Sequence, residues 1–197
     1  MSDVMAKGRR EPWGKVALGY VNDLVVERLT NEPQESIGNF KAIDWGNENE
    51  PEARALYCWR REATVNQVGF LPHCEEEFSQ WVGGSPDGLI DDDGGVEIKC
   101  PFNSKNHVDY ALNGTVPRDY EHQIQGLLWV TGRSWWDFVS FDPRMPKLAR
   151  ISIIRVQRDE DLIGDFRRRT RLFLKMVESR LSKLEEGKIG DERVAAT

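Results

Sequence analysis

One short stretch of the 197-residue sequence, residues 85–100, restricts the possible folds more than any other. Its two apolar runs are typical of short strands, and the aspartates and glycines between them favour the dihedral angles of a tight turn. Successive side chains of a strand point to opposite faces, so Val96 and Ile98 share one face. Glu97 and Lys99 share the other. The stretch therefore predicts a β-hairpin with one apolar and one charged face.

The charged face of this hairpin has the residue types of a metal site. Asp87 lies just before the first strand, with nine residues between it and Glu97. Two carboxylates beside the ammonium of Lys99 can hold a divalent cation such as Mg²⁺, which prefers oxygen ligands. This is the outline of a phosphodiester-cleaving site. A Glu-x-Lys pair alone is more often a solvated outer face, so this pattern leaves both interpretations open.

Composition limits the class of protein. The length and the 39% hydrophobic content suit one globular domain over residues 1–190, and we expect a disordered tail over 191–197. A net charge of −6 argues against coating nucleic acid with the whole surface, so any DNA contact requires a locally basic groove. No apolar run is long enough to span a bilayer. Cys58, Cys74 and Cys100 lack zinc-site spacing and are expected to be free thiols in a reducing cytosol.

The order of elements predicts a mixed α/β fold, with a central sheet flanked by helices. Apolar periodicity indicates helices before and after a group of largely antiparallel strands. Three of the expected helices span residues 14–30, 119–131 and 159–186. A fourth is expected to begin after a cap at Asp44 or Asn47, to carry Pro51 in its first turn and to end at residue 63. The expected strands span 65–71, 78–82, 85–100 as the hairpin, 135–141 and 149–156, with a loose segment from 101 to 117.

With these segments in view, the chain resembles the phage lambda exonuclease-type alkaline nucleases of the restriction-endonuclease-like PD-(D/E)xK superfamily. The segments 85–89 and 97–105 are similar to the catalytic segment of that family, and Gln123-Ile124-Gln125 resembles its glutamine motif. Residues 129–131 and 142–145 resemble the segments that follow. The resemblance spans residues 46–160 and implies a restriction-endonuclease-like core with a mixed α+β architecture and a central mixed β-sheet.

The resemblance implies a role for each matching residue. Asp87 and Glu97 match the main metal ligands, the carbonyl of Ile98 adds a backbone oxygen, and Glu50 matches a carboxylate that helps to hold a second ion. Lys99 matches the residue that orients or deprotonates the attacking water or stabilises phosphate charge. The remaining matches are Gln123, which supports Lys99 and the nucleophile, and the 5′-phosphate-binding positions Ser85, Lys105 and Arg10.

The resemblance further implies a Mg²⁺- or Mn²⁺-dependent 5′→3′ exonuclease with two ions per site, acting on linear double-stranded DNA ends that carry a 5′-phosphate. It implies 5′-mononucleotides and a 3′ overhang as products, a homotrimeric ring, and a single-strand annealing protein as partner in phage-type recombination in a bacterial or phage-infected cytoplasm. Two alternatives stay open: a structure- or sequence-selective endonuclease, and a catalytically silent DNA-end-binding protein.

Overall fold

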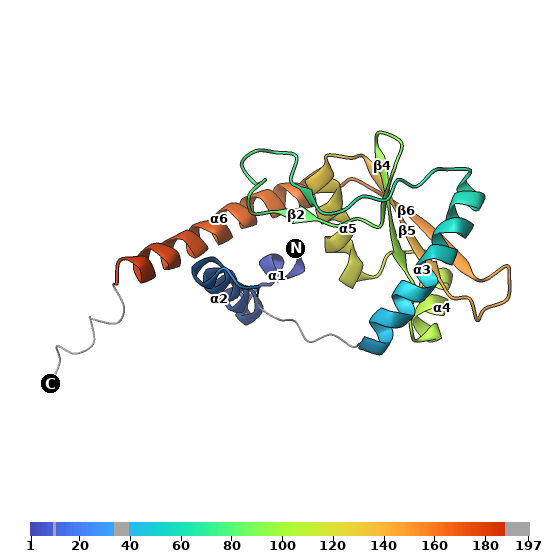
Figure 1. Ribbon diagram of the computed structural model, residues 1–197, viewed down its shortest axis with the longest axis horizontal. Coiled ribbons are helices and arrows are strands. Elements are labelled where there is room, and N and C mark those ends of the chain that lie inside the picture. Colours follow the sequence, from blue (N-terminus) through green and yellow to red (C-terminus); the bar gives the residue numbers. More distant parts are fainter. Residues whose placement is uncertain (10, 34–39, 188–197) are drawn as a thin grey trace. The chain divides into compact units, whose positions relative to one another are not determined.

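The computed structural model describes residues 1–9, 11–33 and 40–187 (Figure 1). The chain divides into two compact units, one combining residues 1–37 with 164–197 and the other spanning 38–163. The predicted single domain over 1–190 stays a prediction, and the predicted tail over 191–197 lies outside the described residues. Among the described residues, no helix has the length and apolarity that a membrane span requires.

The larger unit is built on a four-stranded mixed sheet. Strands β3 (Gly88–Ile90), β4 (Gly94–Lys99), β5 (Trp135–Phe141) and β6 (Ile151–Gln157) lie in the order β3-β4-β5-β6. The β3-β4 and β5-β6 pairs are antiparallel, whereas β4 and β5 are parallel. Parallel strands require a long crossover, which here contains α4 (Ser104–Asn113) and α5 (Arg118–Thr131). The predicted mixed sheet flanked by helices is confirmed, and two of its three strand pairs are antiparallel.

Helices cover both faces of this sheet because both faces carry apolar side chains. Helix α3 (Phe40–Arg61) packs its buried Ala53 and Tyr57 against the face that carries Val96 and Ile98. On the opposite face, the Phe138 ring lies against tyrosines of α4 and α5, with centroid distances of 5.8 and 5.4 Å. The predicted division of β4 into two faces is confirmed, but its charged face is covered by helices.

The glycines at the start of β4 allow the sheet to pack closely. Gly95 lies beside Trp136 across the β4-β5 ladder, and a Cβ atom at this position would lie 2.4 Å from the Trp136 ring. Trp136 is fully buried. Gly94 makes the same close approach to the Trp135 ring. Both glycines are therefore needed for the packing of the tryptophans of β5 as well as for the hairpin turn.

Four predicted segments differ from the structure. Helix α3 begins at Phe40, so Pro51 lies inside it and not in its first turn. The strand expected over 78–82 is a hydrogen-bonded turn, because Phe78 is buried against the Trp129 ring at 4.9 Å. The strand expected over 65–71 is not formed either: Asn66 makes an isolated bridge to Leu89, and only Leu71 belongs to a strand. That strand is the short β1 (Leu71–Pro72), which pairs with β2 (Gly83–Gly84).

The fourth difference is α4, which occupies most of the segment expected to be loose. The side chain of Asn103 accepts a hydrogen bond from the backbone N–H of Lys105, and Gly114 ends the helix in the left-handed conformation. Both are ordinary cap signals. His107, on the buried side of α4, bonds Ser140 and the carbonyl of Ala149 at 2.8 and 2.7 Å.

The smaller unit contains α1 (Ser2–Met5), α2 (Lys15–Thr30) and most of α6 (Glu160–Glu185). Arg169 donates hydrogen bonds to the carbonyls of Val4, Ala6 and Pro12, and its guanidinium lies 4.1 Å from the centre of the Trp13 ring. One arginine of the basic run in α6 thus serves the packing of this unit.

Candidate active site

The site forms where β4 continues past the start of β3. Strand β3 pairs with β4 only as far as Val96, so residues 97–99 have no β3 neighbour. The carboxylate of Asp87, just before β3, accepts a hydrogen bond from the backbone N–H of Ile98 at 2.6 Å. The N–H and C=O of one strand residue point to the same side, so the Ile98 carbonyl also faces this uncovered edge. Asp87 and Ile98 are thereby brought together.

Glu97 is the most buried of the predicted site residues, with 1% of its side chain exposed. Its Oε1 atom accepts hydrogen bonds from Lys99 Nζ and Gln123 Nε2, each at 2.5 Å. Its Oε2 atom is buried and has no hydrogen-bond partner among the described residues. A buried carboxylate oxygen without a partner is costly, so this atom fits a bound cation as its missing partner.

Burial shapes the electrostatics of the carboxylates. Burial raises the pKa of Glu97 to about 7, although neighbouring Lys99 opposes the shift. Burial also raises the pKa of Asp87, against the hydrogen bond from Ile98 and the charge of Lys99. For Lys99, burial lowers the pKa, but the charge of Glu97 and the bond to it outweigh burial, so the net shift is upward. The site therefore favours added positive charge beside its carboxylates and a protonated Lys99.

Glu50 borders the same cleft from α3. Its carboxylate forms an ion pair with Arg54 one turn further along the helix. Burial and the charge of Asp87 raise the pKa of Glu50, which Arg54 opposes. Within the described residues, no three His, Cys, Asp or Glu side chains come together as a ligand cluster. Asp87 and Glu97 thus form the carboxylate pair, and Glu50 lies at the cleft paired with Arg54.

The cleft above these groups has a volume of about 560 Å³. Asp87, Ile98 and Lys99 lie at one side of it. The remaining lining comes from the first half of α3, the segment after β4, α4 and α5. It includes Asn47, Phe102, Asn103, Asn106 and Tyr120, which sequence reasoning missed as site residues. The Tyr120 ring centre lies 5.3 Å from Lys99 Nζ, so this tyrosine limits where the ammonium can move.

The predicted 5′-phosphate-binding residues lie outside the lining of the cleft or outside the described residues. Ser85 and Lys105 are exposed, and neither lines the cleft as the described residues define it. Lys105 lies in the first turn of α4, two residues after the cleft residue Asn103. Arg10 lies outside the described residues. The phosphate pocket therefore stays a prediction.

An arginine absent from the predicted site fixes the wall of the cleft. Arg144 donates to both oxygens of the buried Asp142, at 2.8 Å each, and to the carbonyls of Pro101 and Phe102. Its guanidinium also lies 4.3 Å from the centre of the Trp45 ring of α3. These contacts tie the segment after β4 to α3 across the cleft mouth. The resemblance of residues 142–145 to the family could have pointed to this arginine.

The donor set fits a hard divalent cation. Mg²⁺ is commonly bound through one or two carboxylates, with water and phosphate completing its coordination. Asp87, Glu97 Oε2 and the Ile98 carbonyl supply such oxygens, and within the described part of the chain the buried Oε2 has no other partner. A mixed sheet flanked by helices, with this Asp/Glu/Lys hairpin at its edge, defines the metal-dependent nucleases of the PD-(D/E)xK fold.

The comparisons with known proteins agree with this class. The YqaJ-like viral recombinase domain matches residues 2–134, and the chain belongs to this family. The resemblance to the lambda exonuclease-type alkaline exonucleases is thereby confirmed, together with the predicted fold class. Family and fold support a metal-dependent nuclease, and a DNA exonuclease in particular. No curated protein matches the chain at a significant level.

Among solved structures, the chain is similar to an alkaline exonuclease, LHK-Exo, from Laribacter hongkongensis. The two are 33% identical over 95% of this chain and 89% of the other, with a TM-score of 0.82. A structure of LHK-Exo in complex with dAMP gives 33% identity, coverage of 96% and 91%, and a TM-score of 0.81. A phage-related exonuclease from Haemophilus somnus 129PT, 18% identical with coverage of 93% of each chain and a TM-score of 0.74, shares the fold.

Proposed function

We propose that this protein is a Mg²⁺-dependent exonuclease that digests one strand of linear double-stranded DNA from its 5′ end. It releases 5′-mononucleotides and leaves a 3′ single-stranded overhang for phage-type recombination. The observation that carries the proposal is the convergence of Asp87, Glu97 and Lys99. The buried Oε2 atom of Glu97 has no hydrogen-bond donor among the described residues. The dAMP bound to LHK-Exo supports a deoxynucleoside monophosphate as product.

Each residue has a distinct part in this proposal. Asp87, Glu97 and the Ile98 carbonyl hold the first of two ions, and Glu50 helps to hold the second once it leaves Arg54. When bound, the ions supply a water of lowered pKa and neutralise charge on the phosphate. Mn²⁺ is expected to replace Mg²⁺, since both accept carboxylate oxygens.

Lys99 and Gln123 prepare the site for this chemistry. A protonated Lys99 donates hydrogen bonds, so it orients the attacking water and stabilises the phosphate charge that develops. Gln123 donates to Glu97 Oε1, which leaves Oε2 as the free oxygen. Asp87 is oriented by the Ile98 N–H. The two carboxylates are thereby held by separate donors.

A linear duplex labelled at one 5′ end and, in parallel, at the matching 3′ end tests the direction. The 5′ label should appear as a mononucleotide at once, while the 3′ label stays in a long single strand. A covalently closed circle should resist digestion, and Lys99→Ala is the inactive control. Early loss of the 3′ label, or cutting of the closed circle, contradicts the proposal and favours the endonuclease alternative.

We also propose that Ser85, Lys105 and Arg10 bind a terminal 5′-phosphate. A terminal phosphate carries more negative charge than an internal diester, and a lysine supplies a point charge for it. A 5′-phosphorylated duplex should be digested faster than its 5′-hydroxyl counterpart. Lys105→Ala should reduce this preference without slowing digestion of the hydroxyl end. Equal wild-type rates on both ends would remove the pocket.

The proposed assembly is a homotrimeric ring that works beside a single-strand annealing protein. A chain of net charge −6 must retain a polyanion, and a closed ring retains DNA without tight binding at each step. Light scattering should give about three times the 22.7 kDa chain mass. A monomeric mass, with immediate arrest of digestion by competitor DNA, would refute the ring.

A further inference from the structure

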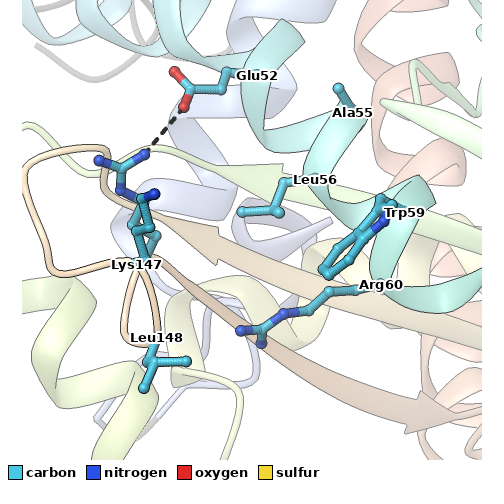
Figure 2. A pocket seen from close by; sticks show the side chains of 8 residues that line it. Glu52, Ala55, Leu56, Trp59, Arg60, Lys147 and Leu148 are labelled. Carbon is cyan, nitrogen blue, oxygen red and sulfur yellow. Dashed lines mark ion pairs between the residues drawn. The ribbon is translucent and has the colours of Figure 1, made fainter.

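A second concave surface lies on the larger unit, away from the residues of the nuclease cleft. We call it the α3 groove and define it by Glu52, Ala55, Leu56, Trp59 and Arg60 of α3, with Lys147, Leu148 and Arg150 of the β5-β6 connection. Its volume is about 680 Å³, and none of these residues lines the cleft. Figure 2 shows Leu56, Trp59 and Arg60 facing the loop that carries Lys147 and Leu148.

The apolar part of the α3 groove is unusually open to solvent. Trp59 is 76% exposed and Leu148 is 91% exposed, although each is large and apolar. Leu56 lies between them and is half-buried against the core. Large apolar side chains that converge on one concave surface are typical of a docking site, whereas single exposed ones are ordinary. The groove can accept one or two bulky apolar side chains.

The rim of the α3 groove is positively charged. The rim carries three cationic side chains, those of Arg60, Lys147 and Arg150. The groove has a single carboxylate, that of Glu52, which lies 3.6 Å from the Arg150 guanidinium. Within the described part of the chain, Arg60 and Lys147 have no acidic partner. Arg61, whose guanidinium is paired with the buried Asp137 at 3.6 Å, lies beside Arg60 in an adjoining hollow and adds no unpaired charge to the rim. This local excess of cations belongs to a chain of net charge −6, so the groove attracts acidic ligands selectively.

We propose that the α3 groove binds an acidic peptide segment of another protein that carries one or two bulky apolar residues. The apolar side chains occupy the floor between Trp59 and Leu148, while the carboxylates pair with the cationic rim. The Trp59 ring and the cationic rim would also suit a DNA strand, but Leu56 and Leu148 can neither stack on bases in the manner of aromatic rings nor bind phosphates, so the lining as a whole fits a peptide better. The site goes beyond the proposed nuclease activity and would recruit the enzyme to a partner.

The experiment measures peptide binding by fluorescence anisotropy in EDTA, where no DNA is digested. The probe is a fluorescein-labelled peptide of four aspartates followed by leucine and phenylalanine. One control peptide replaces the aspartates with lysines, and another replaces the two apolar residues with serines. We expect only the acidic apolar peptide to bind, with an affinity that falls as salt is raised.

Matched substitutions place the binding on the α3 groove. Leu148→Ser and Lys147→Glu should each weaken binding by at least about tenfold, while nuclease activity stays at the wild-type level. Leu112→Ser changes another strongly exposed leucine, and Lys183→Glu another exposed lysine, so both should leave binding unchanged. Because binding is read without catalysis, failure here is distinguishable from failure of the nuclease proposal.

Three results would overturn the proposal. The first is equal affinity for the acidic and lysine peptides, or no change in Leu148→Ser and Lys147→Glu. The second is an oligothymidine probe that loses affinity in Leu148→Ser while the peptide does not, which would make the groove a DNA site. The third is a lower assembly mass of Leu148→Ser by light scattering, which would make it an interface between copies of this chain.

Discussion

Replacement of Gln123 by leucine tests whether the two oxygens of Glu97 have separate tasks. Gln123 Nε2 donates to Glu97 Oε1, which also accepts from Lys99, while Oε2 has no protein partner. Leucine has nearly the shape of glutamine but cannot donate. In this variant Lys99 would be the only remaining donor to Glu97 Oε1 among the described residues, and the carboxylate would be free to rotate.

The magnitude follows from the loss of one hydrogen bond to a buried charged group. Such a bond contributes roughly 1.5–3 kcal/mol. Residues that orient a metal ligand typically change metal affinity by about 10–100-fold when they are removed. We therefore expect Gln123→Leu to require about 10–100 times more Mg²⁺ for half-maximal activity, with most of the rate recovered at saturating Mg²⁺.

Gln125→Leu is a matched control on the same helix. Gln125 is buried, donates to the carbonyl of Gln157 and accepts from the N–H of Asp159. Its replacement should lower the melting temperature and leave the Mg²⁺ dependence unchanged, the opposite of Gln123→Leu. The assay is the end-labelled duplex across a Mg²⁺ titration, with thermal unfolding measured in parallel. An unchanged Mg²⁺ dependence of Gln123→Leu would refute the positioning role.

Three further predictions follow from the geometry of the larger unit. Lys99→Ala and Asp87→Ala should each reduce digestion by at least about 100-fold with a nearly wild-type melting temperature, since both face the cleft; near-wild-type rates would exclude them from the site. Ca²⁺ should support duplex binding in a calorimeter but little turnover, because it is a weaker Lewis acid; full activity with Ca²⁺ or in EDTA would contradict an oxygen-ligated Mg²⁺ site. Burial raises the pKa of Asp142, but hydrogen bonds from Arg144 and Ser104 outweigh it and lower the pKa to about 2 from an ordinary 3.8. The resulting stability, up to about 2 kcal/mol, is present above pH 4 and lost between pH 4 and 2, so Asp142→Asn should flatten that part of an acid unfolding profile.

The hairpin could be predicted from sequence because its signals are local. Strand alternation, turn residues and the chemistry of Asp87, Glu97 and Lys99 all fall within thirteen consecutive residues. The long helices were equally visible, since apolar periodicity needs no tertiary context. Strand β5 and strand β6 were placed within two residues of their observed bounds for the same reason.

The errors arose where packing decides between local alternatives. The apolar residues around Phe78 suit a strand or a turn, and burial of Phe78 against Trp129 selects the turn. Helix α4 has few apolar residues, so its periodicity is weak and only Asn103 and Gly114 mark its ends. The cleft residues Asn106 and Tyr120 become part of the site only through the docking of α4 and α5.

The difference in length between β3 and β4 explains why a nuclease site can form at this edge. A strand edge carries N–H and C=O groups that a neighbouring strand normally satisfies. Here β3 begins opposite Val96, and the carboxylate of Asp87, just before β3, takes the N–H of Ile98 that a longer β3 would have bound. The late start of β3 also leaves the Ile98 carbonyl without a β3 neighbour. If β3 began two residues earlier, its ladder would take the place of the Asp87 carboxylate and cover the Ile98 carbonyl, so the proposed metal site depends on the late start of this strand.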